Sequence, residues 1–231
     1  MQIPLPVRLD DENAFTNFLP HHGVALAVAQ LREGLVHRPL RAFLHGAPGC
    51  GRSHLLQACC HALEPESSGF VYLPLAEVRA LPAAELLAGL EERALVCLDD
   101  LGSVAGLPAW EEALFHLFNR LQTSNGSLLV AARQPPAGLG IALPDLLSRL
   151  QSLPVFALAL PDDAALAEVL VLRARGRGLL MEQEVARYIV QRAARELPGL
   201  LGLLEQLDRQ SLAAGRRLSI PFVREALGWQ G

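Results

Sequence analysis

Residues 46–54 read GAPGCGRSH, a glycine-rich stretch between a short apolar segment and a segment of helical character. It matches the phosphate-binding pattern G-x-x-x-x-G-K-[ST] at every position except the lysine. Arg52 stands in place of that lysine, and Ser53 supplies the hydroxyl group. A strand before the loop and a helix after it are the context that this pattern requires, so the stretch predicts a nucleotide-binding loop.

The residue types of the loop indicate its chemistry. Glycines allow backbone conformations that turn N–H groups inward around a phosphate, and the helix N-terminus adds partial positive charge. A guanidinium is planar and larger than an ammonium, so Arg52 favours holding a diphosphate over following a γ-phosphate through transfer. The predicted nucleotide contacts in this segment are Gly46, Pro48, Gly49, Cys50, Gly51, Arg52, Ser53 and His54.

An acidic pair supplies the second half of the predicted site. The apolar run at 94–98 (ALVCL) is typical of a buried strand, and Asp99 and Asp100 follow it directly. We predict that Asp99 and Ser53 hold Mg²⁺ and that Asp100 stands where an acid would orient a water molecule. Both acids could instead lie in a surface turn or cap a helix, but the upstream loop disfavours that interpretation.

Strand and helix patterns alternate along the first two thirds of the chain. Alternation of this kind predicts a parallel sheet covered on both faces by helices. The predicted strands are 41–45, 70–73, 94–98, 127–132 and 155–160. One predicted helix, 24–35, precedes the first strand, and the helices between the strands are 53–63, 82–93 and 110–121.

After Pro161 only helical patterns follow. They cover 164–175, 182–196, 199–214 and 220–227. The sequence therefore predicts an α/β fold with a five-stranded parallel sheet and a small all-α lid domain. The predicted divisions are an extended tail at 1–12, a nucleotide-binding domain at 13–160 and the lid at 161–231.

Composition narrows the class of protein. The net charge is −4 and no lysine is present, which argues against a protein that coats nucleic acid. Apolar runs are far shorter than the roughly 20 residues that span a bilayer, and the N-terminus shows no leader, so we expect a cytoplasmic protein without a membrane partner. Neither the four cysteines nor the seven histidines have metal-ligand spacing, and the cysteines are predicted to be buried.

Four stretches together resemble a known family. They are GAPGCGRSHLL, LVCLDDL, LPDLLSRL and LSIPFVREAL, and they are similar to the Hda-type regulatory inactivators of DnaA. These are short AAA+ relatives of the replication initiator DnaA, and the resemblance covers essentially the whole chain. An arginine in the loop is usual in that family. The resemblance implies an AAA+ fold, bound ADP or ATP with Mg²⁺, and DnaA as a partner.

The resemblance also gives the N-terminal residues a role. The sequence QIPLPV is similar to the short motif, commonly Q-L-x-L-P-L, with which such proteins dock on the sliding clamp, the beta subunit of DNA polymerase III. Its prolines pre-extend the peptide and lower the entropy cost of ordering it. Its apolar residues would fill a groove while the glutamine bonds at the edge. The predicted clamp contacts are Gln2, Ile3, Pro4, Leu5, Pro6 and Val7.

Two arginines receive roles only from the resemblance. Arg149 matches the arginine finger of the family, which reaches the γ-phosphate of a neighbouring molecule in trans. Arg195 matches the lid arginine that senses the nucleotide of its own chain. Ala132 and Arg133 stand where related ATPases place a polar or acidic group near the γ-phosphate, and this departure weakens the expectation of vigorous hydrolysis.

The favoured prediction is a regulatory adaptor of the initiator. With bound nucleotide, ADP by the resemblance, it would dock on the DNA-loaded clamp and present Arg149 to ATP-bound DnaA, whose hydrolysis would prevent re-initiation. We expect it at the nucleoid and replisome. The helix-turn-helix domain that follows the lid in DnaA is absent after Gly231, so sequence-specific DNA binding is not expected.

Two alternatives stay open at this point. One is an autonomous AAA+ ATPase of helicase-loader type that acts on single-stranded DNA. The other is a DnaA-like member of a filament at an origin. Self-association into a homo-oligomer also stays open.

Overall fold

The computed structural model describes residues 9–63 and 69–229 and divides into two units. The first unit contains the described residues up to Phe15 together with His22–Ala159. The second contains Thr16–His21 and the described residues from Leu160 on. The predicted clamp contacts at 2–7 lie outside the described residues.

A five-stranded parallel sheet forms the centre of the first unit, as predicted. Its strand order is β2-β3-β4-β1-β5, so β1 lies between β4 and β5. Strands β3 and β4 are buried along their whole length, as expected for a parallel sheet with both faces covered. The strand bounds are β1 Arg41–His45, β2 Phe70–Pro74, β3 Leu95–Asp99, β4 Leu128–Ala132 and β5 Val155–Ala157.

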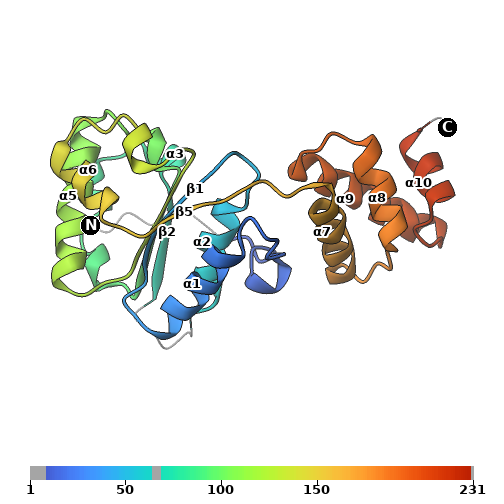
Figure 1. Ribbon diagram of the computed structural model, residues 1–231, viewed down its shortest axis with the longest axis horizontal. Helices are drawn as coiled ribbons and strands as arrows, with labels where there is room; N and C mark the ends of the chain where they lie inside the picture. Colours follow the sequence, from blue (N-terminus) through green and yellow to red (C-terminus); the bar gives the residue numbers. More distant parts are fainter. Residues whose placement is uncertain (1–8, 64–68, 230–231) are drawn as a thin grey trace. The chain divides into compact units, whose positions relative to one another are not determined.

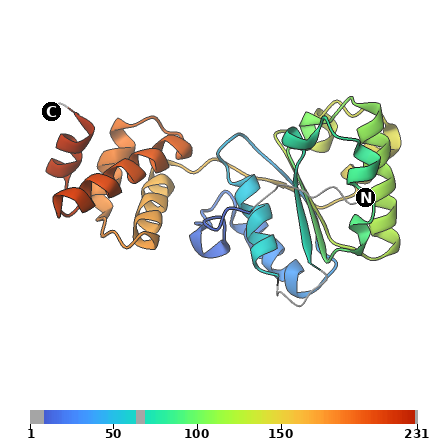
Figure 2. The ribbon, with the colours of Figure 1, turned by 180° about the vertical axis from the view of Figure 1, so that it is seen from behind.

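Helices cover the two faces of this sheet. Helices α1 (Ala25–Val36) and α2 (Arg52–His61) lie on one face, and α5 (Pro108–Thr123) and α6 (Pro144–Gln151) lie on the other (Figures 1 and 2). Alternate residues of β3 show the same division, because Val96 and Leu98 join the core with α5 and α6 while Cys97 Sγ lies 3.6 Å from Cys60 Sγ of α2.

Short elements connect the strands and helices of the main layers. They are the single-turn helices α3 (Leu75–Val78) and α4 (Ala83–Leu86) and the 3-10 turns η1 (Phe15–Asn17), η2 (Leu90–Glu92), η3 (Leu101–Ser103) and η4 (Pro136–Gly138). All four cysteines are buried and free, which confirms that prediction. Within the described ranges, every helix is too short or too polar to cross a bilayer.

Three predicted elements are wrong in extent. The helix predicted at 82–93 ends after one turn, because Gly89 adopts a left-handed conformation (φ 73°) and the chain continues into η2. The strand predicted at 155–160 ends at Ala157. The helix predicted at 182–196 ends at Arg192, because Ala193 is extended and a new helix begins with a proline in its first turn.

The second unit is a small helical domain, as predicted. Apolar side chains of all four helices form one core that includes Leu170, Ile189, Leu204 and Phe222. The side chain of Asp162 caps the first helix by accepting a 2.8 Å hydrogen bond from the backbone N–H of Ala165. The helices are α7 Asp163–Gly176, α8 Gln183–Arg192, α9 Leu197–Ala214 and α10 Ile220–Leu227.

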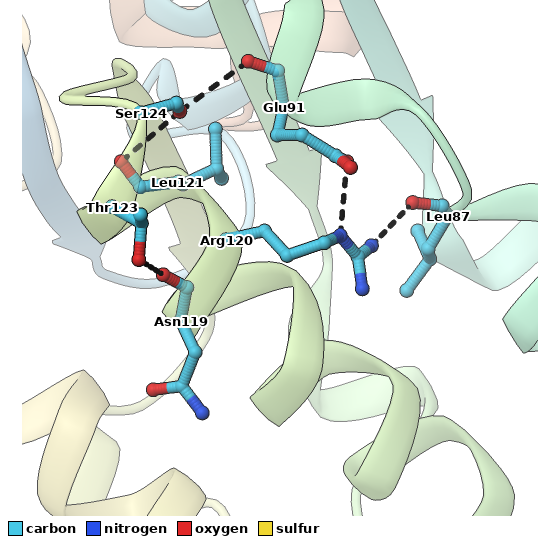
Figure 3. Close-up of polar contacts among 7 residues, drawn as sticks. All are labelled: Leu87, Glu91, Asn119, Arg120, Leu121, Thr123 and Ser124. Atoms are coloured by element: carbon cyan, nitrogen blue, oxygen red, sulfur yellow. Dashed lines mark hydrogen bonds and ion pairs between the residues drawn. The ribbon is translucent and has the colours of Figure 1, made fainter.

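Polar contacts fasten the C-terminal end of α5 to the segment around η2. Arg120 donates a 2.9 Å hydrogen bond to the carbonyl oxygen of Leu87, and its Nε lies 3.0 Å from Oε2 of Glu91 (Figure 3). The hydroxyl of Ser124 adds a 3.4 Å bond to the carbonyl oxygen of Glu91. The end of α5 is therefore held by directional bonds as well as by apolar packing.

We predict that Arg120→Gln lowers the free energy of unfolding of the first unit by about 1 kcal/mol near neutral pH. Burial raises the pKa of Glu91, but a hydrogen bond from its own backbone N–H and the contact with Arg120 outweigh that effect, so the pKa lies below its ordinary value of 4.5. A carboxyl whose pKa is lower in the folded state stabilises the fold above its unfolded pKa. That contribution is lost as the pH falls below 4.5 and through the folded pKa.

Urea unfolding followed by the fluorescence of buried Trp110, in a Trp229→Phe background, measures the first unit alone. The difference between wild type and Arg120→Gln should shrink as the pH falls below 4.5. The control is Arg209→Gln, which removes an exposed Arg209–Glu205 pair of the second unit and should leave this transition unchanged. If Arg120→Gln lowers the free energy of unfolding by the same amount near neutral pH and well below pH 4.5, the contribution does not come from the Arg120–Glu91 contact.

Candidate nucleotide-binding site

The glycine-rich loop connects β1 to α2 at the carboxyl edge of the sheet. Gly49 and Gly51 have left-handed conformations, with φ of 86° and 94°, and Gly51 is the residue at which α2 is capped. A side chain at Gly46 would meet the carbonyl oxygen of Leu158 at 2.4 Å. The glycines are thus required by this backbone, which presents the N-terminus of α2 to a ligand at the sheet edge.

Arg52 brings a positive charge to this loop. Its Nη1 is buried and has no hydrogen-bond partner among the described residues. Burial lowers the pKa of His45 at the end of β1, and the positive charge of Arg52 lowers it further. Burial raises the pKa of the Cys50 thiol against the opposing effect of Arg52. A buried guanidinium nitrogen without an acceptor fits a site whose acceptor is an anion.

Asp99 ends β3 as predicted, and both of its carboxylate oxygens are engaged. Oδ1 accepts a 2.9 Å bond from the backbone N–H of Asp100, and Oδ2 accepts a 2.7 Å bond from the hydroxyl of Tyr72. Burial, followed by the charge of Asp99, raises the pKa of Tyr72, while hydrogen bonds with Gln57 and Ser53 act the other way. Tyr72 therefore stays protonated and donates to the carboxylate at neutral pH.

Tyr72 is a site residue that the sequence analysis did not identify. It pairs in register with Cys97, two residues before Asp99, so its side chain lies on the same face of the sheet as the carboxylate. The available signal was a tyrosine inside an otherwise apolar strand. Tyr72 donates to Asp99, and Ser53 contributes to lowering the pKa of Tyr72, so the tyrosine lies near both predicted Mg²⁺ ligands.

These side chains can supply only part of a cation site. Among the described residues there is no group of three or more His, Cys, Asp or Glu that could hold a metal ion. Mg²⁺ in nucleotide sites is bound through one or two protein oxygens, with phosphate and water completing its shell. The pair Ser53 and Asp99 fits that kind of coordination.

Asp100, predicted to orient a water molecule, is paired with a cation. It has a left-handed conformation (φ 54°), and its Oδ1 lies 4.0 Å from Nε of Arg133, which follows β4. The side chain of Arg133 is 68% exposed, so the pair is weak in energy. The structure therefore places a cation beside the acid that was predicted to orient water.

One face of α2 holds the N-terminal segment of the described chain. Gln57 Oε1 accepts a 2.8 Å bond from the backbone N–H of Asp10, and Nε2 of His61 lies 3.0 Å from the carbonyl oxygen of Asp10. Nε2 of His54, predicted to contact nucleotide, lies 2.9 Å from the carbonyl oxygen of Ala14. The structure therefore places the ring of His54 against the N-terminal segment of the first unit.

The two predicted arginines belong to different units. Arg149 is half-buried on α6, which packs on the face of the sheet opposite α2 (Figure 1). Among the described residues no carboxylate pairs with its guanidinium. Arg195 lies in the second unit between α8 and α9, where its Nη2 is 3.2 Å from Oδ2 of Asp163.

Comparisons with known proteins follow this division of the chain. The family model described as the bacterial DnaA ATPase domain matches residues 9–154, and the model described as the Hda lid domain matches residues 162–227.

Solved structures with the same fold include DnaA proteins and a motor protein. Domain III of the replication initiation protein DnaA from Thermotoga maritima is 21% identical, with 96% of this chain and 98% of that chain covered and a TM-score of 0.81. AMPPCP-bound DnaA from Aquifex aeolicus is 22% identical, with 90% and 70% covered and a TM-score of 0.73. The branch migration motor RuvB from Thermotoga maritima is 15% identical, with 94% and 71% covered and a TM-score of 0.65.

We predict that Tyr72→Phe destabilises the first unit by about 1.5–3 kcal/mol, because the buried Asp99 carboxylate loses a hydrogen bond to a charged acceptor. Urea unfolding followed by Trp110 fluorescence measures this change. The matched control is Tyr188→Phe in the second unit, where the hydroxyl is buried without a hydrogen-bond partner among the described residues. Removing that hydroxyl should leave the second unit, monitored by the neighbouring Trp229, unchanged or more stable. If both variants lose the same free energy of unfolding, the hydrogen bond from Tyr72 to Asp99 does not contribute specifically to stability.

Proposed function

This chain belongs to the Hda-type, DnaA-related AAA+ family, and we propose that it is a nucleotide-bound regulator that stimulates ATP hydrolysis by DnaA in trans. The observation that carries the proposal is the combination, in one chain, of a DnaA-type ATPase domain with an Hda-type lid. In this role the chemistry takes place in the DnaA site, which converts ATP-bound DnaA to its inactive ADP form and prevents re-initiation.

The proposed ligand of the chain's own loop is ADP or ATP with Mg²⁺. Support comes from the unsatisfied Nη1 of Arg52, the left-handed glycines and the pair Ser53 and Asp99. A relative of the same fold was solved with AMPPCP. When bound, the cation would neutralise phosphate charge; Ser53 and Asp99 would hold it, and Arg52 would hold the phosphates. Arg195 is proposed to sense the nucleotide from the lid.

Weak hydrolysis in the chain's own site is part of the proposal. Arg52 replaces the compact lysine charge by a planar guanidinium, and Arg133 faces Asp100 at 4.0 Å. Both features favour keeping a diphosphate over turning over a triphosphate. The autonomous helicase-loader type of ATPase requires the opposite behaviour, with steady hydrolysis that single-stranded DNA stimulates.

Arg149 is the proposed group that acts on DnaA. Its guanidinium has no carboxylate partner among the described residues, and α6 lies on the sheet face opposite α2. An arginine in that position is available to a neighbouring molecule, where it would stabilise negative charge on the transferring γ-phosphoryl group.

The proposed docking partner is the beta sliding clamp, bound through residues 2–7. The segment that follows them is fastened to α2 through Asp10 and Ala14. The tail would therefore connect to the helix that begins at the nucleotide loop. This arrangement would bring the regulator to DNA without a sequence-specific DNA contact of its own.

We predict that the wild-type protein accelerates single-turnover hydrolysis of ATP preloaded on DnaA in the presence of DNA-loaded clamp. Arg149→Ala should lose about 10³-fold of this acceleration, because arginine fingers contribute on that scale to phosphoryl transfer. Arg79→Ala, an exposed arginine of the first unit, is the control and should retain it. ADP affinity should be equal in all three proteins.

Two results would argue against this function. Acceleration that persists in Arg149→Ala would remove the finger from the mechanism. No acceleration by the wild type, together with ATP hydrolysis that single-stranded DNA stimulates, would instead establish the helicase-loader type of ATPase.

A further prediction concerns the clamp. Leu5→Ala should weaken binding to the isolated clamp by about tenfold or more, because a buried leucine side chain contributes roughly 1.5–3 kcal/mol. Leu26→Ala on α1, where the side chain is 69% exposed, is the control and should bind as wild type does. Surface plasmon resonance with immobilised clamp gives both affinities, and unchanged binding of Leu5→Ala would exclude the tail as the docking segment.

A further inference from the structure

Glu111 is a buried carboxylate that neither the nucleotide site nor the proposed clamp contact uses. It lies in the first turn of α5 and is only 2% exposed. Its oxygens accept hydrogen bonds from three backbone N–H groups: Gly106 at 2.7 Å, Ala142 at 3.0 and 3.1 Å, and Leu143 at 2.7 Å. A single side chain therefore joins the turn before α5 to the segment that leads into α6.

The bonds to Ala142 and Leu143 hold the two residues that lead into α6, a helix without a side-chain cap. Leu143 is the N-cap residue of α6, and it has no side-chain oxygen that could accept a bond from the first turn. Pro144 follows as the first helical residue. Glu111 instead brings a carboxylate from the neighbouring helix to the backbone N–H groups at this end, where negative charge is favourable.

Apolar packing holds α6 in a different way. Leu146 and Leu150 point into the core, one turn apart, and share it with Leu114 and Phe118 of α5. Such contacts decide which face of α6 is buried, but they are not directional. The bonds that Glu111 accepts from the N–H groups of Ala142 and Leu143 are directional, so they fix where α6 begins relative to α5.

Helix α5, to which the start of α6 is bonded, is itself held by polar contacts. The other end of α5 is held by Arg120, which contacts Leu87 and Glu91 (Figure 3). α5 is therefore bonded near both ends, and α6 is bonded to α5 at the end from which it starts. Arg149 lies in the second turn of α6, half-buried and beside the core residue Leu150.

We propose that Glu111 is a positioning residue for Arg149: by anchoring the start of α6, it holds the guanidinium where a neighbouring molecule's phosphates can receive it. Its effect on activation rests on the proposed function, whereas its effect on α6 is a property of this chain alone. A displacement of about 1 Å in a positioned group can cost 10²-fold in rate. Loss of the anchor should therefore reduce activation strongly without altering nucleotide binding.

The test compares Glu111→Gln with Glu112→Gln, the same change at the next residue. The side chain of Glu112 is 74% exposed, and its Oε1 lies 3.8 Å from Nε2 of His116 in the same helix. In Glu111→Gln an amide that can donate replaces an oxygen that accepts, so the N–H groups of Ala142 and Leu143 lose part of their acceptor. Hydrogen exchange at 142–151 should rise at least tenfold in Glu111→Gln and stay as in wild type in Glu112→Gln, with exchange around Arg52 unchanged in both.

Activity gives a second, independent reading. Glu111→Gln should lower the stimulation of DnaA hydrolysis by about tenfold to 10²-fold, with ADP affinity within twofold of wild type. Added to Arg149→Ala it should cause no further loss, because both changes remove the same guanidinium from the DnaA site. Glu111→Asp keeps the charge but shortens the reach, and it gives an intermediate result if the glutamine variant does not fold.

Different results overturn different statements. Unchanged exchange at 142–151 in Glu111→Gln, or an additive loss in the double variant, overturns the positioning role. Faster exchange at 142–151 with no stimulation of DnaA even by wild type supports the anchor and overturns the proposed function instead.

Discussion

The parallel pairing of β1 between β4 and β5 is the constraint on which the rest of this protein depends. It places the carboxyl ends of β1, β3 and β4 at one edge of the sheet, so His45, Asp99 and Arg133 meet there although they are far apart in sequence. The loop after β1 passes close to the carbonyl oxygen of Leu158 and turns through two left-handed glycines into the N-terminus of α2.

The two faces of the sheet have separate tasks. On one face, α2 carries the nucleotide loop, and Tyr72 supports Asp99 from the neighbouring strand. On the other face, α6 carries Arg149, and Glu111 of α5 bonds to the residues that lead into α6. The proposed nucleotide site and the proposed arginine finger therefore belong to opposite faces of one sheet, which suits the proposed regulator whose chemistry happens in a neighbouring molecule.

Much of the fold and part of the site were predictable from local patterns. The strand at 41–45 and the helix at 220–227 have the predicted bounds, because an apolar run and a Ser-Ile-Pro start mark them clearly. The prediction of one helix at 82–93 was wrong in extent, because Gly89 takes a left-handed conformation that ends the local hydrogen bonding. Tyr72 and Glu111 were missed because their partners are backbone or side-chain groups distant in the chain, which periodicity does not report.

The sequence by itself determined the order of strands and helices, the glycine-rich loop with its arginine, and the acidic pair at the end of β3. These depend on neighbouring residues, through backbone preference and the spacing of apolar side chains. Only the tertiary structure decided that Arg52 keeps a buried nitrogen without a partner among the described residues, that Arg133 faces Asp100, and that Glu111 bonds to the residues that lead into α6. Burial and charge depend on which distant segments meet, and the fold alone brings those segments together.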